Sequence, residues 1–499
     1  MRKQILLAVM LLGLCLTASS QIPTKFYTEG KAPALHPKAE LNRASIPIKT
    51  MPAVNNEKLL QRDSKRAKMD VPFRFGKGFE VDFSLKDGKW RKTRDGRVWN
   101  LKIHSKGAYS INLILDELHL PKGGELYLYN ENRDAIYGPV TSTQNTPPDK
   151  DFLTDIIPGN TVTIDLFEPA SKKGSSTLRI RKVVHAYKNL FQSFSEMSLG
   201  DSDDCNNDKD INCYSNWDKP SDAVAMVLLS NGDELCSGAL LNNTAQNFRP
   251  FFLSAFHCID YESPHDELSD SEISDAENWM FKFQYKVTEC NGNTVRTTYT
   301  YDKANFRAAW NNTDFALMEL KNSPLGNSEI TWLGWDKSGN TPTEGTGIHH
   351  PSGDVMKIAF DYDQLNSSSW PTNNNHWLLN YDKGVVEHGS SGSIILNQNK
   401  RVVGQLHGNQ NYDPYKDYCD QPRAEYGKFS RSWTGGGTPA TQLKHWLDPC
   451  GTNANTTNTV RSPYISGSTP LCTSTKTYSL HNLPSGSSVT WSATPSHLF

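Results

Sequence analysis

The sequence predicts an all-β protein with more than one domain. Most of the chain after residue 70 consists of short segments in which apolar and polar residues alternate, as in strands with one buried face. Turn-forming glycine, proline and asparagine residues separate these segments. Helical periodicity is scarce and is clearest near the end, where Leu443 and Leu447 share one face. The 499 residues also exceed the length of one typical domain.

The first twenty residues have the organisation of a secretory signal peptide. Arg2 and Lys3 precede an apolar run, and the small residues Ala18 and Ser20 stand before an expected cut near Gln21. The run is too short and too weakly flanked for a retained membrane anchor, which is the alternative. We therefore expect a secreted, extracellular protein whose residues 1–20 are removed.

Composition excludes several classes of partner. Hydrophobic residues make up 36% of the chain, and 52 basic residues against 54 acidic ones give a net charge of -2. This balance offers no electrostatic reason for binding nucleic acid or an anionic membrane. We expect a soluble monomer that acts on proteins or peptides.

Residues 21–199 are expected to form a separate N-terminal part. Residues 22–70 are polar and rich in proline and lysine, which predicts a loosely ordered leader. Over about 71–190, the segments VWNLKIHS, AYSINLIL, GELYLYN, TVTIDLF and STLRIRKVV predict an antiparallel β-domain. Its Trp90 and Trp99 are typical of a core, although a glycan-binding β-sandwich is an alternative. Residues 190–204 are rich in serine and aspartate, as in an exposed linker that proteases cut readily.

The cysteines begin abruptly after that linker. Of nine, Cys15 leaves with the signal peptide, and the other eight all lie at or after Cys205. An even number in an exported chain predicts disulfides. No spacing matches a zinc site, so we expect no metal and no cofactor.

The end of the chain differs again. Residues 451–462 form a polar linker, and residues 463–499 hold two candidate strands around a Pro-Ser-Gly turn. We interpret this stretch as a truncated β-sandwich-like module, and the chain as a fragment of a longer product.

Three short motifs between residues 200 and 450 carry the chemistry. His257 follows the apolar run FFLSAF and precedes Cys258, so a disulfide there would hold a general base rigidly. Asp314 opens the apolar strand DFALMEL, where a buried acid can orient a histidine ring. Taken alone, His257 could be a packed histidine and Asp314 a strand-initiating aspartate, each with a purely structural role.

The third motif, EHGSSGSII, is the most specific. Gly389 and its following residues fit G-x-S-G-x, with glycines that expose the Ser391 hydroxyl and aim the amides of Gly389 and Ser391 at one oxyanion. A flexible Gly/Ser turn is the alternative, but apolar strands bound the motif downstream. The order His257, Asp314, Ser391 is that of chymotrypsin-like enzymes. An intact set of three disfavours the alternative of an inactive binding or adhesion module.

Residues 200–450 resemble the bacterial lysyl endopeptidases, which are secreted trypsin-fold proteases. The resemblance rests on CSGALLNNTA, FFLSAFHC, DFALMEL, GWD, HHPSGD, GVVEHGSSGS, RVVGQLHG and SWTGGG followed by WLDP. Residues 71–190 resemble the family's propeptide through AYSINLILDELHLP, GELYLYN and IIPGN. The resemblance implies a trypsin-like double β-barrel over 200–450, and we expect the propeptide to cover its cleft as an inhibitor.

The resemblance also implies particular residues. It implies a tryptophan and a histidine near the catalytic histidine, at Trp370 and His407, and three disulfides: Cys205–Cys419, Cys213–Cys290 and Cys236–Cys258. Cys450 and Cys472 lie outside that set and are left to pair with each other or elsewhere. His349 and His350 are adjacent, so in a strand they face opposite ways and are expected to be structural.

Substrate preference is where the chain departs from the family. The family's lysine-binding aspartate stands just before a Tyr-Gly pair, and Ala424 occupies its position before Tyr426 and Gly427. Cleavage after Lys or Arg would then need Glu425, or Asp420 through a loop shift, because a buried cation needs an anion. If neither reaches the pocket, Ala424 forms its wall and neutral P1 residues are preferred.

Overall fold

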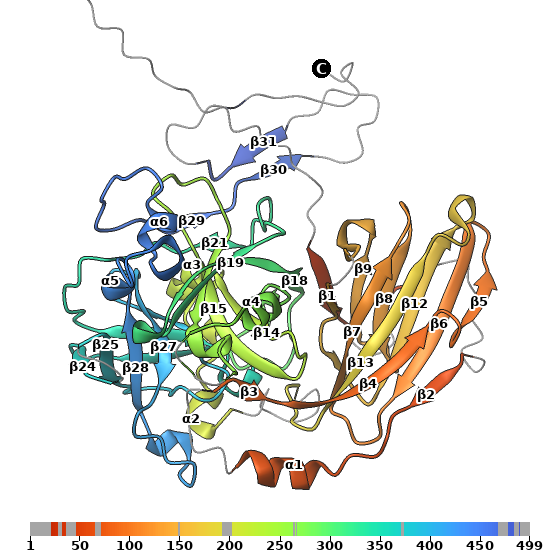
Figure 1. The fold of residues 1–499 in the computed structure, drawn as a ribbon, viewed down its shortest axis with the longest axis horizontal. Coiled ribbons are helices and arrows are strands. Elements are labelled where there is room, and N and C mark those ends of the chain that lie inside the picture. The colour runs from red at the N-terminus through yellow and green to blue at the C-terminus, as the bar shows by residue number, and fades with distance from the viewer. Residues whose placement is uncertain are drawn as a thin grey trace, which may run out of the picture.

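The computed structural model describes residues 21–27, 32–35, 46–64, 71–147, 150–191, 202–262, 265, 267–370, 374–467, 478–483 and 489. It has two lobes side by side, which we call the N-terminal lobe (residues 46–191) and the second lobe (residues 202–461) (Figure 1). The predicted signal peptide and Cys472 lie outside the described residues. Among the residues described, no helix is long and apolar enough to cross a membrane.

The N-terminal lobe consists of two mostly antiparallel layers. One layer holds β2 (Ile48–Thr50), β5 (Lys89–Lys92), β6 (Gly96–His104), β8 (Glu125–Asn130), β9 (Ala135–Val140) and β12 (Thr161–Pro169). The other holds β4 (Gly76–Ser84), β7 (Ser110–His119), β10 (Phe152–Leu153), β11 (Ile157–Pro158) and β13 (Thr177–Ala186). Side chains from both layers share one apolar core, which includes the fully buried Trp99. This arrangement confirms the predicted β-rich region and the core role of Trp99.

Two large antiparallel sheets form most of the described part of the second lobe. The first holds β14 (Val224–Leu228), β15 (Glu234–Leu241), β16 (Phe251–Ala255), β17 (Met280–Phe283), β18 (Thr298–Asp302), β19 (Ala304–Trp310) and β20 (Phe315–Leu320). The second holds β22 (Gly345–His349), β23 (Lys357–Asp361), β24 (Asn366–Ser368), β25 (His376–Asn380), β26 (Ile394–Leu396), β27 (Val402–Gly408) and β28 (Arg423–Lys428). The all-β class is confirmed, whereas closure of each sheet into a barrel remains a prediction.

The remaining elements are short. The strands are β21 (Thr331–Trp332), β29 (Val460–Arg461), β30 (Tyr464–Gly467) and β31 (Tyr478–His481). The helices are α1 (Asn56–Asp63), α2 (Asp204–Asn207), α3 (Asp218–Ser221), α4 (Asp270–Ala276), α5 (Phe429–Ser432) and α6 (Lys444–Leu447). β30 and β31 form an antiparallel hairpin after the main body, in the region predicted as a partial β-module.

The leader expected to be loosely ordered contains ordered strands, so that expectation is wrong where the structure describes it. β1 (Ile22–Phe26) pairs with β18 of the second lobe on one side and with β9 of the N-terminal lobe on the other. β2 (Ile48–Thr50), also in the leader, pairs with β6 of the N-terminal lobe. Just after the leader, β3 (Phe73–Arg74) pairs with β15 of the second lobe. Tertiary pairing therefore orders sequences whose own periodicity is weak, and one sheet runs through both lobes (Figure 1).

The lobes share a buried interface. Apolar side chains from both lobes form one cluster there, including Phe75, Phe191, Met226 and Tyr285. Within it, Lys282 Nζ lies 2.9 Å from Asp155 Oδ1, with side chains 1% and 0% exposed. Removing one partner of such a buried pair costs about 3–5 kcal/mol, because the other charge stays desolvated. The interface thus couples the two lobes by charge as well as by apolar packing.

Among the cysteines that the structure describes, the disulfides are Cys205–Cys419, Cys213–Cys290 and Cys236–Cys258, the pairs that the resemblance implies. All three lie in the second lobe. Cys450 is exposed and free, and Cys472, its suggested partner, is outside the described residues.

Candidate active site

His257 sits in a short turn directly after β16. This turn, Phe256–Cys258, is held by the disulfide from Cys258 to Cys236 on β15. Closing a loop of this size is worth about 3 kcal/mol in the chain-entropy model. The backbone that carries His257 is therefore fixed from two sides, as a general base requires.

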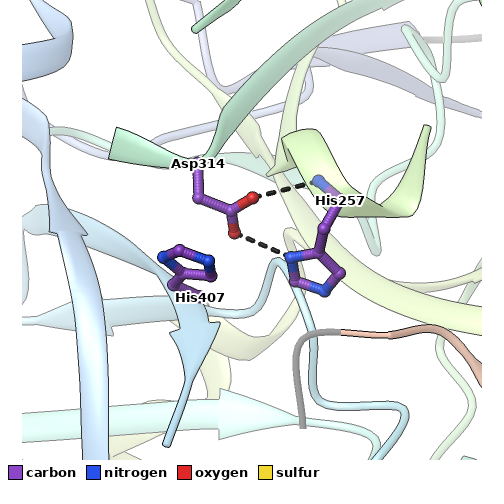
Figure 2. Close-up of side chains that lie close together, drawn as sticks. All are labelled: His257, Asp314 and His407. Carbon is purple, nitrogen blue, oxygen red and sulfur yellow. Dashed lines mark hydrogen bonds and ion pairs between the residues drawn. The ribbon is translucent and has the colours of Figure 1, made fainter. Parts of the chain in front are cut away.

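Asp314 reaches the histidine from an unusual backbone conformation. It caps a 3-10 turn just before β20 with φ of 56°, in the left-handed region that aspartate tolerates better than most residues. Its Oδ2 lies 2.8 Å from His257 Nδ1, and its Oδ1 accepts the His257 backbone N–H at 3.0 Å (Figure 2). One carboxylate thus fixes both the ring and the backbone of His257.

This geometry sets the tautomer of His257. The Asp314 side chain is almost completely buried, and an ionised carboxylate can only accept hydrogen bonds. Nδ1 of His257 must therefore carry the hydrogen, which leaves Nε2 as the basic nitrogen.

Ser391 lies in a glycine-bounded turn after β25. Gly389 has φ of 92°, and a Cβ there would come within 2.9 Å of the His350 carbonyl oxygen. Gly392 has φ of 78°, and a Cβ there would lie 2.4 Å from Ser254 Oγ. Both glycines are therefore required by conformation and by space. These constraints disfavour the alternative of a flexible Gly/Ser turn.

The turn that carries Ser391 is bonded to the sheet that carries His257. Ser237 on β15 donates its N–H to the Ser391 carbonyl oxygen at 2.8 Å and its hydroxyl to the Gly389 carbonyl oxygen at 2.8 Å. Ser237 follows Cys236, whose disulfide holds the His257 turn. Ser391 itself is only 2% exposed.

His407 stacks between His257 and Trp370. The ring centroids of His407 and Trp370 are 4.2 Å apart with planes 23° from parallel, and those of His407 and His257 are 5.9 Å apart at 21°. The structure thus stacks His407 on His257, and Trp370 on the His407 ring. Burial lowers the pKa of His407 well below its usual value, so its ring is neutral.

His376 on β25 is a neighbour that the sequence reasoning missed. Its Nε2 lies 3.0 Å from Nδ1 of His407, and burial lowers the pKa of His376 to about 3. Two neutral imidazoles share this bond only if one donates and the other accepts, so each ring fixes the other's tautomer. No local pattern marks this pair, because His376 and His407 lie on β25 and β27, which only the sheet order brings to either side of β28.

His257, Asp314 and His407 lie close enough to be considered as metal ligands. Their ligand atoms all lie within 4.8 Å of one another. However, the two imidazole rings are nearly parallel, and a metal must lie in the plane of each ligating ring. The arrangement suits proton transfer better than coordination.

Ala424 and Glu425 point to opposite sides of β28. Ala424 packs in an apolar cluster with Leu379 and Leu406 and is fully buried. Glu425 is also buried, but its Oε1 accepts from Arg423 Nε at 2.8 Å and its Oε2 from the Gln410 N–H at 3.0 Å. Asp420 is exposed at the end of a 3-10 turn. The structure therefore pairs Glu425 within its own strand, away from the face of Ala424.

His349 and His350 have structural partners. His349 Nδ1 lies 2.7 Å from Ser390 Oγ, and His350 Nδ1 lies 2.9 Å from the Asp354 carbonyl oxygen. Both are fully buried, and burial lowers both of their pKa values. These buried partners agree with the structural role expected for both histidines.

Two comparisons with known proteins bear on the class of enzyme. Residues 199–420 match the family model described as the C-terminal domain of lysyl endopeptidase. A lysyl endopeptidase of Pseudomonas aeruginosa is 26% identical over 434 residues, which cover 81% of this chain and 88% of that protein. This chain is a lysyl endopeptidase-like serine endopeptidase. The predicted resemblance and enzyme class are thereby confirmed, with proteins or peptides as the substrates of this endopeptidase.

Two solved protease structures align with the endopeptidase over less than half its length. The inactive form of the Mycobacterium tuberculosis protease Rv3671c is 13% identical and covers 44% of this chain and 87% of its own, with a TM-score of 0.27. An HtrA-type protease with a bound tripeptide is 13% identical and covers 42% of this chain and 56% of its own, with a TM-score of 0.28. TM-scores this low carry no conclusion about the endopeptidase.

Proposed function

We propose that this chain is the precursor of a secreted serine endopeptidase that works through His257, Asp314 and Ser391. The observation that carries the proposal is the buried bond of 2.8 Å between His257 Nδ1 and Asp314 Oδ2. It leaves His257 Nε2 as a base on the side of the site from which a serine proton can be taken.

The reaction is acyl transfer in two halves. Ser391 Oγ attacks the scissile carbonyl carbon while its proton passes to His257 Nε2, and the amides of Gly389 and Ser391 stabilise the resulting oxyanion. The intermediate collapses as the scissile C–N bond breaks and His257 gives the proton to the leaving amine. Water then attacks the acyl-enzyme, again with His257 as base, and restores Ser391.

We propose that the P1 pocket of this enzyme is uncharged. The resemblance implied cleavage after Lys or Arg, and the relative from Pseudomonas aeruginosa is named a lysyl endopeptidase. However, Ala424 replaces the acidic anchor, and the Glu425 carboxylate is held by Arg423 and Gln410. A substrate lysine would then be buried without an anion, which is unfavourable. Neutral P1 residues avoid that cost.

A peptide library cleaved by the processed enzyme tests this preference. We expect Leu and other neutral P1 residues to be cleaved better than Lys or Arg, and the Ala424→Asp variant to shift cleavage to Lys by about tenfold or more, since a buried charge pair replaces a neutral contact. Glu425→Gln is the matched control, because it removes an acid on the opposite face. A strong Lys preference in the parent enzyme would show that the pocket has an acid elsewhere, and its loss in Glu425→Gln would identify Glu425 as that acid.

We propose that residues 21 to about 200 are the propeptide and that this part inhibits the enzyme before export. The mature enzyme is then extracellular and monomeric. The pairing of β1 and β3 with second-lobe strands supports inhibition by the attached N-terminal lobe. Exposed linkers between domains are preferred cleavage sites. N-terminal sequencing of the active form should give a start close to residue 200, shortly before Cys205. A start before residue 150 would exclude this processing.

A further inference from the structure

The cavity at His257 is lined by both lobes. It has a volume of about 610 Å³, and its lining includes His257, Asp314 and His407 from the candidate active site. Val71, Pro72 and Arg74 of the N-terminal lobe line the same cavity. The segment around β3 therefore occupies space next to the reacting groups.

The register of β3 shows how this segment is aligned. β3 is antiparallel to β15, with Phe73 opposite Leu235 and Arg74 opposite Glu234. Continued in this register, Val71 would stand opposite Ser237, the residue whose N–H donates to the Ser391 carbonyl oxygen at 2.8 Å. A chain that continued β3 toward its N-terminus in this register would therefore approach Ser391. Taking the bond that follows Val71 as the counterpart of the cleaved bond makes Arg74 the counterpart of the third residue after it.

The side chain at that third position is bound by an acid. Both Arg74 Nε and one of its terminal nitrogens lie 3.1 Å from Glu234 Oε1, and the Glu234 side chain is only 13% exposed. Asn231 donates to the other oxygen, Oε2, at 2.9 Å. Asp260 and Asp275 also line the cavity, so its acidic groups favour a cation.

Phe73, the residue before Arg74, anchors β3 by apolar packing. Phe73 is buried in the cluster shared by the two lobes, and the Lys188 ammonium lies 4.3 Å from the centre of its ring. An extended peptide that adds to a strand edge in this way gains its affinity from the backbone and its selectivity from pockets for its side chains.

We infer that the edge of β15 at Glu234 and Leu235 is a substrate subsite. There, Glu234 selects a basic side chain at the third residue after the cleaved bond. In the precursor, Arg74 occupies this subsite. This inference rests on the proposed function, because it takes Ser391 as the nucleophile. The ligand class is an extended peptide with lysine or arginine at that position.

The processed enzyme tests this selectivity with internally quenched peptides that differ only in the third residue after the cleaved bond: Lys, Gln or Glu. We expect kcat/KM for Lys to exceed that for Glu by about fivefold, the scale of a partly exposed ion pair. Glu234→Gln should abolish the difference, and Glu234→Lys should reverse it. Glu289→Gln, which changes an exposed acid elsewhere in the second lobe, should retain the preference for Lys over Glu.

The outcomes separate this inference from the proposed function. If no peptide is hydrolysed, the proposed function fails. If the peptides are hydrolysed but Glu234→Gln keeps the Lys preference, only the subsite is overturned.

In the full-length chain, Arg74→Gln should speed conversion to the processed form by about two- to fivefold, since it removes the same ion pair. Arg74→Lys should convert at nearly the parent rate. Equal rates for all three chains would overturn the role of Arg74.

Discussion

Replacing Asp314 by asparagine should lower kcat of the processed enzyme by about ten-thousand-fold, on the scale measured for the equivalent change in another serine protease. The asparagine amide can donate a hydrogen bond to Nδ1 of His257, so the ring would carry its hydrogen on Nε2 instead. Nε2 could then no longer accept the serine proton. The fold should persist, because asparagine has nearly the same shape and its oxygen can still accept the His257 backbone N–H.

Asp260→Asn is the matched control for that variant. Asp260 lines the same cavity but bonds to His265 rather than to His257. We expect its kcat to stay within about tenfold of the parent value, since it leaves the His257 tautomer unchanged. A loss of less than tenfold in Asp314→Asn itself would mean that Asp314 does not orient His257, and a second acid would have to be sought.

Much of the candidate site could be predicted from sequence because its determinants are local. The His257 turn, the strand after Asp314 and the glycines around Ser391 are short motifs whose backbone needs are readable from residue type. The resemblance also predicted their arrangement in space. Trp370, which the resemblance implied near the catalytic histidine, stacks on His407.

The features that escaped prediction depend on contacts between distant segments. β1 looked like part of a loose leader, because its strand state comes from pairing with β18, far along the chain. The Arg74–Glu234 pair likewise joins residues 160 positions apart. No local pattern marks such pairs, since each partner alone is an ordinary surface charge.

The orientation of Glu425 illustrates the same limit within a single strand. Alternation in β28 predicts that it faces away from Ala424. On that side, the Glu425 carboxylate accepts hydrogen bonds from Arg423 and from the backbone N–H of Gln410, and only the structure shows these partners. This is why the sequence left three possibilities for the P1 pocket, and why the geometry favours the uncharged one.

Ser391→Ala carries the largest expected effect, a loss of about a million-fold in kcat, because the proposed acyl-enzyme forms on the Ser391 hydroxyl. Its most direct test is labelling of the processed enzyme with a fluorophosphonate, followed by mass spectrometry of the modified peptide. We expect one label, on Ser391, with loss of peptidase activity in proportion to labelling, and no label on the folded Ser391→Ala variant. Full hydrolysis by that variant, or an active enzyme that takes its label on another residue, would contradict the assignment of Ser391 as the nucleophile.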